Sequence, residues 1–400
     1  MSKFGALYKN EMIKIFHKKA LVVVIAITLL AVFAVGMFVK AFEDSVFDSA
    51  SYSGITKGSV EGSIDRMKEN IKSDKVAESA DRLHNAIEKY DADYGDDVNY
   101  YALAQDIAKL SVYYESAING KYLSYPMTED NYDYLMNSAA ILEYRIEECR
   151  EEYLLSNSED ELNTQVTRVM MMIIFSINIV LIIILAGSSI SHEISSGSIK
   201  SLIIAPVKRA KIFWAKFLSV LTVGLCVYLI EYLLICLYCM ILFGFDNSFF
   251  AFISGSNIYS MSVYLKNLII ILISYIVMIS FAAIAIMLSS VSRNTAASVG
   301  GSMGIYYAGT VATSVLSYFI NPIFIKYIPF THFQALSEIE LVKNESRDVL
   351  NLIFRYAQNG SYSFFRSNAD SGFAFSVIYV VIFTAIMLWI ARDSFIKRDI

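Results

Sequence analysis

The chain has 400 residues, of which 56% are hydrophobic and only 18% are charged, and its mean hydropathy is +0.49. A soluble globular chain is less apolar and more charged, so this composition excludes an ordinary soluble domain and indicates an integral membrane protein. The net charge is -5 and the basic residues are scattered, which argues against nucleic acid as a partner.

The first 39 residues combine a basic segment with a long apolar run. In residues 1–19, lysines alternate with apolar residues at helical spacing, which predicts an amphipathic helix on the cytoplasmic membrane face. The run 20–39 has the basic flank of a signal peptide but is too long and lacks a clear small-residue cleavage site. We therefore expect an uncleaved first span.

Further apolar runs are long enough to cross about 30 Å of hydrocarbon at about 1.5 Å per helical residue. The six predicted spans are residues 20–39, 169–187, 212–243, 268–288, 296–320 and 373–390. Basic residues gather before the first span, in the segment 188–211 and in the tail 391–400, which places both termini in the cytoplasm. The predicted fold is an all-α, multi-pass membrane protein.

The segment 40–168 lies outside the cell on this topology. It is tyrosine-rich, with roughly two acidic residues for each basic one. Three stretches have apolar residues at helical spacing, and Thr128 is a candidate N-cap for the last of them. Their apolar positions are Ile64, Met67 and Ile71; Leu103, Ile107, Leu110 and Tyr114; and Leu135, Ala139, Leu142 and Ile146. We expect a folded helical domain here and short interfacial or re-entrant pieces in 321–372.

The four cysteines and the histidines indicate neither a disulfide framework nor a metal site. Three cysteines lie in one apolar run, and Cys236 and Cys239 lack the second ligand pair of a zinc site. His192 and Glu193 begin a zinc-peptidase pattern, but Ser196 stands where the second histidine is required. We expect no metal and no catalytic residue in this chain.

The segment 188–211 contains the most informative pattern, which reads SHEISSGSIKSLIIAPVKRAK from Ser191. It predicts a short cytoplasmic helix around Gly197 to Ile204, with apolar anchors that include Leu202, ended by Pro206. A helix of this kind can fit a groove on a soluble partner.

This segment closely resembles the coupling region of ABC type-2 exporter permeases, in which an acidic residue precedes a Gly-Ser step, apolar residues, Pro-x-x-Arg and a lysine. The matching residues are Glu193, Gly197, Ser198, Pro206, Arg209 and Lys216. The resemblance implies that the segment contacts an ATPase subunit through Glu193, Gly197, Ser198, Lys200, Leu202, Pro206 and Arg209. It also implies an amphipathic "elbow" helix in residues 1–19 and makes 40–168 an insertion. The location that it implies is a bacterial cell membrane.

The sequence contains no G-x-x-x-x-G-K-[ST] phosphate loop, so ATP and Mg²⁺ belong to a separate ATPase subunit. The resemblance implies a second permease chain, identical or different, and export by alternating access. An alternative is a membrane-anchored receptor whose outer domain binds a ligand. An intramembrane enzyme is disfavoured, because the spans show no nucleophile and base pair.

Two features inside the spans leave alternatives open. Glu231 shares a helical face with Tyr228 and Tyr232. It is either a carboxylate of the substrate pathway or a buried carboxyl bonded to a neighbouring helix. Small residues recur at Gly300, Gly304 and Ala308, which permits close helix contact within the chain or between two permease chains.

Overall fold

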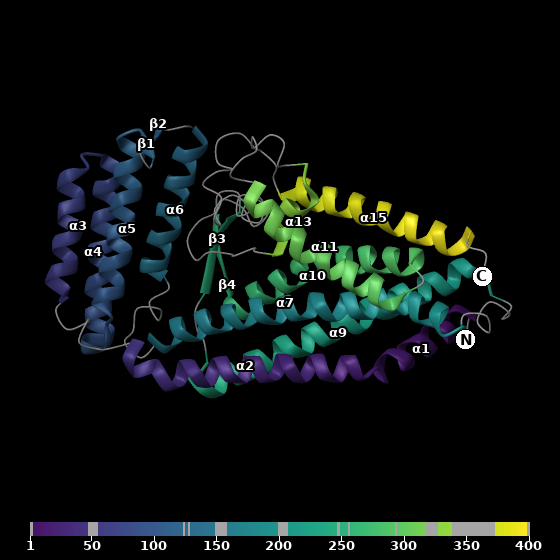
Figure 1. Cartoon of the computed structure of the whole chain (residues 1–400). Coiled ribbons are helices and arrows are strands. Elements are labelled where there is room, and N and C mark those ends of the chain that lie inside the picture. Colours follow the sequence, from purple (N-terminus) through teal and green to yellow (C-terminus); the bar gives the residue numbers. More distant parts are fainter. Residues whose placement is uncertain are drawn as a thin grey trace.

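The computed structural model describes residues 3–46, 55–122, 125–126, 129–148, 158–198, 207–245, 249–254, 257–292, 294–316, 327–337 and 373–397. This part of the chain is nearly all-helical, with two short antiparallel hairpins (Figure 1). The predicted helical fold class is therefore confirmed.

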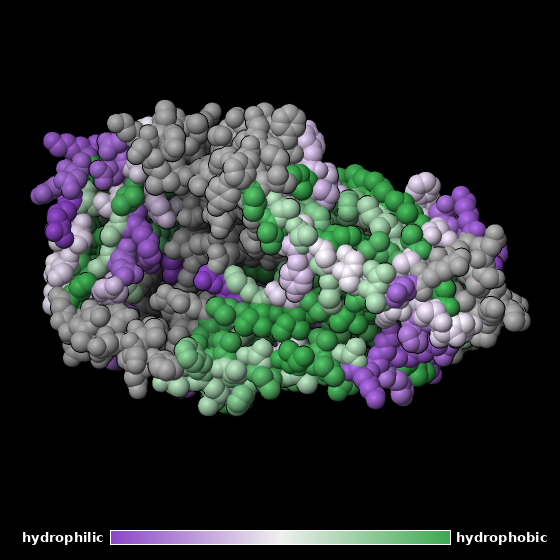
Figure 2. Space-filling model, in the orientation of Figure 1, coloured by the Kyte–Doolittle hydropathy of each residue, from purple (hydrophilic) through white to green (hydrophobic). Residues whose placement is uncertain are grey.

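Five helices in the described residues are long and apolar enough to cross a membrane. They are α2 (Lys19–Val46), α7 (Ser158–Ser195), α9 (Arg209–Phe243), α10 (Val263–Val291) and α15 (Phe373–Lys397). Large apolar side chains such as Leu30, Phe33 and Ile241 remain exposed on them, as expected for surfaces that contact lipid. Figure 2 shows these apolar residues over the helices and hydrophilic residues at both ends of the molecule.

The predicted span 296–320 corresponds to helix α11 (Thr295–Leu316), which packs against α7 and α10. It is not one of the five helices above, because glycine, serine and threonine make up much of its length and lower its hydropathy. The helix is closely packed nevertheless: a Cβ atom at Gly187 of α7 would lie 3.0 Å from Val299 Cγ2.

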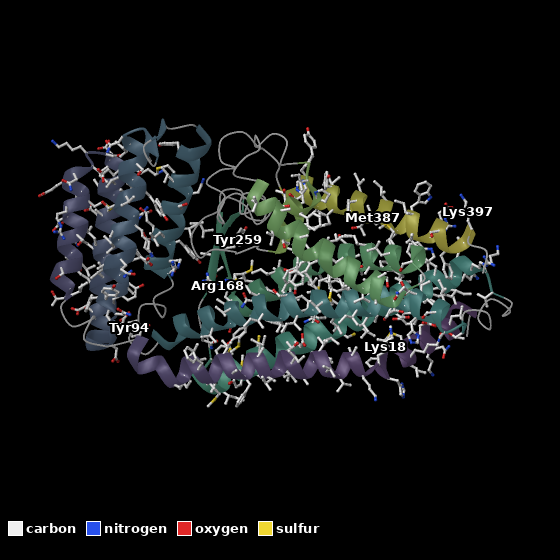
Figure 3. All side chains as sticks on the ribbon, in the orientation of Figure 1. Lys18, Tyr94, Arg168, Tyr259, Met387 and Lys397 are labelled. Carbon is white, nitrogen blue, oxygen red and sulfur yellow. The ribbon has the colours of Figure 1, made fainter. Side chains whose placement is uncertain are left out.

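The N-terminal basic segment is helical as predicted, and forms α1 (Lys3–Phe16). It packs against α9, where the Tyr8 hydroxyl donates to Thr222 Oγ1 at 2.7 Å. Helix α1 and the last turn of α15 lie at the same end of the spans, which we call the terminal end (Figure 1). Lys18 and Lys397 mark this end in Figure 3.

At the opposite end of the spans lies a four-helix domain (Figure 1). It consists of α3 (Lys57–Asn70), α4 (Asp74–Tyr94), α5 (Tyr100–Ile118) and α6 (Glu129–Glu148), with a short 3₁₀ turn at Gly95–Asp97 and a small hairpin of β1 (Lys121–Tyr122) and β2 (Tyr125–Pro126). Its apolar core is separate from that of the spans. The predicted apolar positions of α3, α5 and α6 are all buried. Thr128 lies outside the described residues.

Helix α4 is a fourth helix that the sequence analysis did not predict. Its buried residues follow the same helical spacing: Val76, Ala80, Leu83, Ile87 and Tyr90. The many charged residues between them hide this pattern in the sequence. The domain is therefore a four-helix bundle rather than three helices.

Asp106 of α5 is a buried carboxyl group of the four-helix domain, and another is Glu143 of α6. Glu143 accepts hydrogen bonds from Ser79 and Tyr114, and it forms an ion pair with Arg82 at 2.8 Å. Burial and the neighbouring Glu143 raise the pKa of Tyr114. These partners come from α4 and α5, so the buried charge joins three helices of the domain.

A second hairpin, β3 (Phe249–Ser254) and β4 (Asn257–Ser262), lies between α9 and α10. Ala251 and Ile258 of this hairpin pack against Ile141 and Tyr144 of α6. The four-helix domain therefore contacts the loop that joins two spans. Tyr259 marks the hairpin in Figure 3.

The segment 321–372 is described only in part. Helix α13 (Pro329–Ser337) packs against α15, and His332 Nδ1 lies 3.0 Å from Ser376 Oγ. This short helix is consistent with the expected short pieces, and most of the segment lies outside the described residues.

Candidate coupling and pathway sites

Four charged side chains meet at the terminal end and form what we call the charge cluster: Glu11 and Lys14 of α1, Glu193 of α7 and Lys216 of α9. Lys216 Nζ lies 2.9 Å from Glu11 Oε2 and 2.7 Å from Glu193 Oε1, and its side chain is only 1% exposed. Lys14 pairs with the same two carboxylates at 2.8 and 3.0 Å. The cluster therefore connects three helices.

Equal numbers of acids and lysines make this burial possible. Removing one charge from water costs several kcal/mol, and a close opposite charge offsets that cost. Burial alone raises the pKa of Glu11, but Lys216 and Lys14 outweigh it, so the pKa stays below its ordinary value of 4.5. Burial lowers the pKa of Lys14, but Glu11 and Glu193 outweigh it and raise the pKa above its ordinary value. Glu11 therefore stays ionised at neutral pH because of the lysines.

Lys18 lies beside the cluster, in the turn between α1 and α2. Its Nζ donates to Ser188 Oγ of α7 at 2.9 Å. Burial and the positive charge of Lys216 lower the pKa of Lys18 to about 8. A fourth element, the start of α2, is thus also attached to the end of α7.

The residues after Glu193 end α7. Gly197 has φ +73°, a left-handed conformation that is strained for other residues, and its N–H donates to the Ile194 carbonyl at 3.2 Å. The Ser198 hydroxyl lies 3.4 Å from the Glu193 carbonyl oxygen. Gly197 therefore lies in a turn, so the expectation that it belongs to a new helix is wrong at this position. Lys200, Leu202 and Pro206 lie outside the described residues.

Arg209 is the first residue of α9 and connects this helix to the last turn of α15. Its Nη1 donates to the Ile396 carbonyl at 3.1 Å. One turn later, the rings of Phe213 and Phe395 lie 6.1 Å apart. The start of α9 therefore contacts α1, α7 and α15 at one end of the bundle.

The second candidate site lies within the spans, around Glu231 of α9, which is 3% exposed. Asn178 Nδ2 of α7 donates to its carboxyl group, and Thr28 of α2 also interacts with it. Asn178 is 1% exposed, and its Oδ1 has no hydrogen-bond partner among the described residues. The site therefore consists of three polar side chains from three spans.

The two tyrosines that share the Glu231 face are also buried. Tyr232 donates from its hydroxyl to the Tyr264 carbonyl at 2.6 Å, and Tyr228 is 1% exposed. Tyr264 lies at the start of α10, so this face of α9 points into the bundle, as its polar residues predict.

The small-residue stripe of α11 has a different environment. Gly300, Gly304 and Ala308 are exposed, and a Cβ atom added at either glycine meets no described atom within 4 Å. The close contacts of α11 within the chain use other residues, such as Val299 against Gly187. The stripe thus remains available on the surface of the described bundle.

Comparison with known proteins decides the family. Residues 6–400 match the family model described as ABC-2 family transporter protein. The chain belongs to this family. ABC-2 proteins are membrane transport components, so the resemblance seen in the coupling region is confirmed at the level of the family.

Two Bacillus subtilis (strain 168) proteins are similar to this ABC-2 chain. It is 28% identical to the uncharacterized membrane protein YdbK over 149 residues, which is 36% of this chain and 57% of YdbK. It is 26% identical to the uncharacterized protein YhcI over 230 residues, which is 54% of this chain and 63% of YhcI. The matched regions thus span about three fifths of each relative.

The sequence analysis found one side of the charge cluster and missed the other. The family pattern pointed to Glu193 and Lys216, which the structure brings to 2.7 Å. Glu11 and Lys14 were missed, because Glu193 and Lys216, their partners on α7 and α9, lie far away in the sequence. One signal was present: Glu11 is the one acidic residue in the otherwise basic segment 1–19.

Proposed function

We propose that this chain is the permease subunit of an ABC exporter and that a separate ATPase subunit drives it. The charge cluster is the observation that supports this proposal most strongly. It connects the end of α7, where the coupling segment begins, to α1 and to α9 through buried ion pairs. A force on the coupling segment therefore acts on three helices at once.

The proposed mechanism is alternating access. The terminal end faces the cytoplasm in this account, because the basic residues gather there. Closure of the ATPase subunits moves the coupling segment after α7, which includes Lys200, Leu202 and Pro206. Glu193 passes the movement to Lys216 and Lys14, and Arg209 passes it to α15. The spans then repack between inward-open and outward-open states.

ATP and Mg²⁺ are bound by the partner ATPase in this proposal, and the chemistry takes place there. A second permease chain completes the pathway. The exposed stripe of Gly300, Gly304 and Ala308 supports a contact with that chain, since small residues let two helices approach closely.

The Glu231 site is proposed to lie on the substrate pathway, together with Tyr228 and Tyr232. A buried carboxyl group within a span is costly and commonly has a function. Glu231→Gln retains a hydrogen-bond acceptor for Asn178 but removes the negative charge. We expect this variant to assemble normally and to lose transport; normal transport by the variant would show that the charge has no role in the pathway.

Co-expression with an ATPase subunit that contains a phosphate loop tests the proposed function. We expect the two chains to purify together and ATP to drive transport in reconstituted vesicles. Leu202→Asp places a charge on the apolar anchor of the coupling segment, so it should abolish co-purification, whereas Val112→Asp in the four-helix domain should not. Failure of the wild-type chain to bind any such ATPase, including one encoded by an adjacent gene, would contradict the proposal.

A membrane-anchored receptor remains the second candidate function. It is favoured by one observation, the separate apolar core of the four-helix domain. Deletion of residues 45–161 distinguishes the two candidates. A receptor loses ligand binding and shows no transport defect in any assay, whereas a permease that uses the domain has a defect in transport.

A further inference from the structure

A group of serines joins α7 to two other helices near the terminal end. We call it the serine junction: Ser191 of α7, Ser289 of α10 and Ser298 of α11, around Gly187. All three serines are buried. Ser289 Oγ accepts from two successive backbone N–H groups of α7, at 3.2 Å from Ile190 N and 2.9 Å from Ser191 N.

In a regular α-helix these two N–H groups bond to the carbonyls of Ala186 and Gly187. In this structure, both carbonyl oxygens also accept hydrogen bonds from serine hydroxyls. Ser189 Oγ lies 2.7 Å from the Ala186 oxygen, and the Gly187 oxygen lies 2.8 Å from Ser191 Oγ and 2.7 Å from Ser298 Oγ. Hydroxyl groups from three helices therefore bond to backbone N–H and C=O groups of α7 over one turn, within a helix that continues to Ser195.

Serine hydroxyls that bond to the backbone of a helix are one of the known causes of helix bending. Helices α7 and α11 also approach closely at this turn, because a Cβ atom at Gly187 would lie 3.3 Å from Val299 Cα. It lies directly before Glu193 in the chain. Any displacement of the charge cluster relative to the rest of α7 must pass through this turn.

We propose that residues 187–191 form a hinge in α7, and that Ser289 and Ser298 are positioning residues that pass movement of the coupling segment to α10 and α11. This inference rests on the proposed function. It assigns a route to two helices, α10 and α11, to which the described ion pairs of the charge cluster do not extend.

The simpler interpretation is that buried serines in spans only satisfy their own hydroxyl groups. Ser302 of α11 behaves in that way, since its Oγ donates to the Ser298 carbonyl of its own helix at 2.6 Å. Ser289 differs because its described hydrogen bonds go to α7, a neighbouring helix. Ser302→Ala is therefore a matched control, because it also removes a buried serine hydroxyl, but one whose described hydrogen bond stays within its own helix.

Spin labels on either side of the turn test the hinge. Val169→Cys and Ser195→Cys are exposed positions of α7 on the two sides of the turn, in a background without the four native cysteines. A straight helix would place their backbones about 39 Å apart. We expect the wild-type complex with its ATPase to change this distance when ATP and vanadate are added. The Ser289→Ala, Ser298→Ala double variant should stay near the straight-helix distance in both states, and Ser302→Ala should respond as the wild type does.

A functional readout separates positioning from simple stability. We expect the double variant to hydrolyse ATP at a rate close to that of the wild type, while the amount transported per ATP falls about fivefold or more. Equal loss of hydrolysis and transport, or a distance change equal to that of the wild type, would overturn the inference. Absence of any response to nucleotide in the wild-type complex would instead overturn the proposed function on which it rests.

Discussion

The two ends of this molecule are stabilised in different ways. The four-helix domain has its own apolar core, and the buried carboxyl group of Glu143 has partners on α4 and α5 of the same domain. At the terminal end, Lys216 is held by carboxylates from α1 and α7, which come from opposite sides of the domain in the sequence. The domain therefore has the contacts of a separate folding unit, whereas the terminal end depends on assembly of the spans.

This difference suggests how each end responds to change. Damage to the domain core should remain local, because the described apolar contact of the domain with the rest of the chain is the small patch between α6 and the β3–β4 hairpin. Damage to the charge cluster should loosen several helices together. The two tryptophans, Trp214 and Trp389, both lie in spans, so their fluorescence reports on that part alone.

Lys216→Met should have the largest effect. It leaves Glu11 and Glu193 buried with only Lys14 as partner, and breaking a buried ion pair costs about 3 to 5 kcal/mol. We expect a lower midpoint of the tryptophan-fluorescence transition on heating in detergent. Lys211→Met removes the same charge from an exposed position of α9 and should leave the midpoint unchanged. Equal midpoints for the two variants would mean that the cluster does not stabilise the spans.

Leu83→Ala should cost about 2 to 5 kcal/mol, because it opens a cavity in the core of the four-helix domain. We expect proteolysis within residues 57–148 to become faster. The tryptophan transition of the spans should not move. Val112→Ala, at a position of α5 that is 56% exposed, is the control for proteolysis. A shift of the tryptophan transition in Leu83→Ala would contradict the independence of the two ends.

Gly197→Ala should cost about 1 kcal/mol, because alanine is strained in the left-handed conformation that ends α7. Gly62→Ala provides the opposite case: it lies inside α3 with open space around it, so alanine should stabilise the domain by about 0.5 to 1 kcal/mol. Thermal unfolding measures whether each substitution lowers or raises the stability of the protein. A neutral Gly197→Ala would mean that the turn after α7 does not require glycine.

The smallest effect is a dependence on pH. The folded pKa of Glu11 lies below 4.5, so ionised Glu11 contributes stability above that pH, and the contribution is lost as pH falls through the folded pKa. Glu11→Gln lacks this contribution to stability, because an amide does not ionise. We expect the difference in unfolding midpoint between the wild type and Glu11→Gln to shrink as pH decreases below 4.5. A difference that stays constant over this range would exclude ionised Glu11 as the source of the stability.

Local patterns in the sequence predicted much of the fold. Apolar runs predicted the five helices of the structure that are long and apolar enough to cross a membrane. Helical spacing predicted α3, α5 and α6. The same spacing in α4, such as Val76, Ala80 and Leu83, was overlooked among charged residues. The exposure of Gly300 and Gly304 could not be predicted, because spacing shows that a helix can be approached closely but not which neighbour approaches it.

Sequence reasoning reached the candidate sites only in part. The pattern around Glu193 was visible because it is contiguous, and Glu231 was visible because a charge is rare inside an apolar run. The partners were not visible: Glu11, Asn178 and Ser289 act through contacts between helices that are far apart in the sequence. Contacts of that kind depend on how helices pack, which local periodicity does not specify.

Chemical crosslinking to the ATPase subunit tests the central claim most directly. Ser195→Cys at the terminal end and Val112→Cys in the four-helix domain are compared in inverted membrane vesicles that contain the co-expressed ATPase, on the cysteine-free background. Our account predicts a covalent adduct between the permease and the ATPase from Ser195→Cys and none from Val112→Cys. An adduct from Val112→Cys, or none from Ser195→Cys, would contradict it.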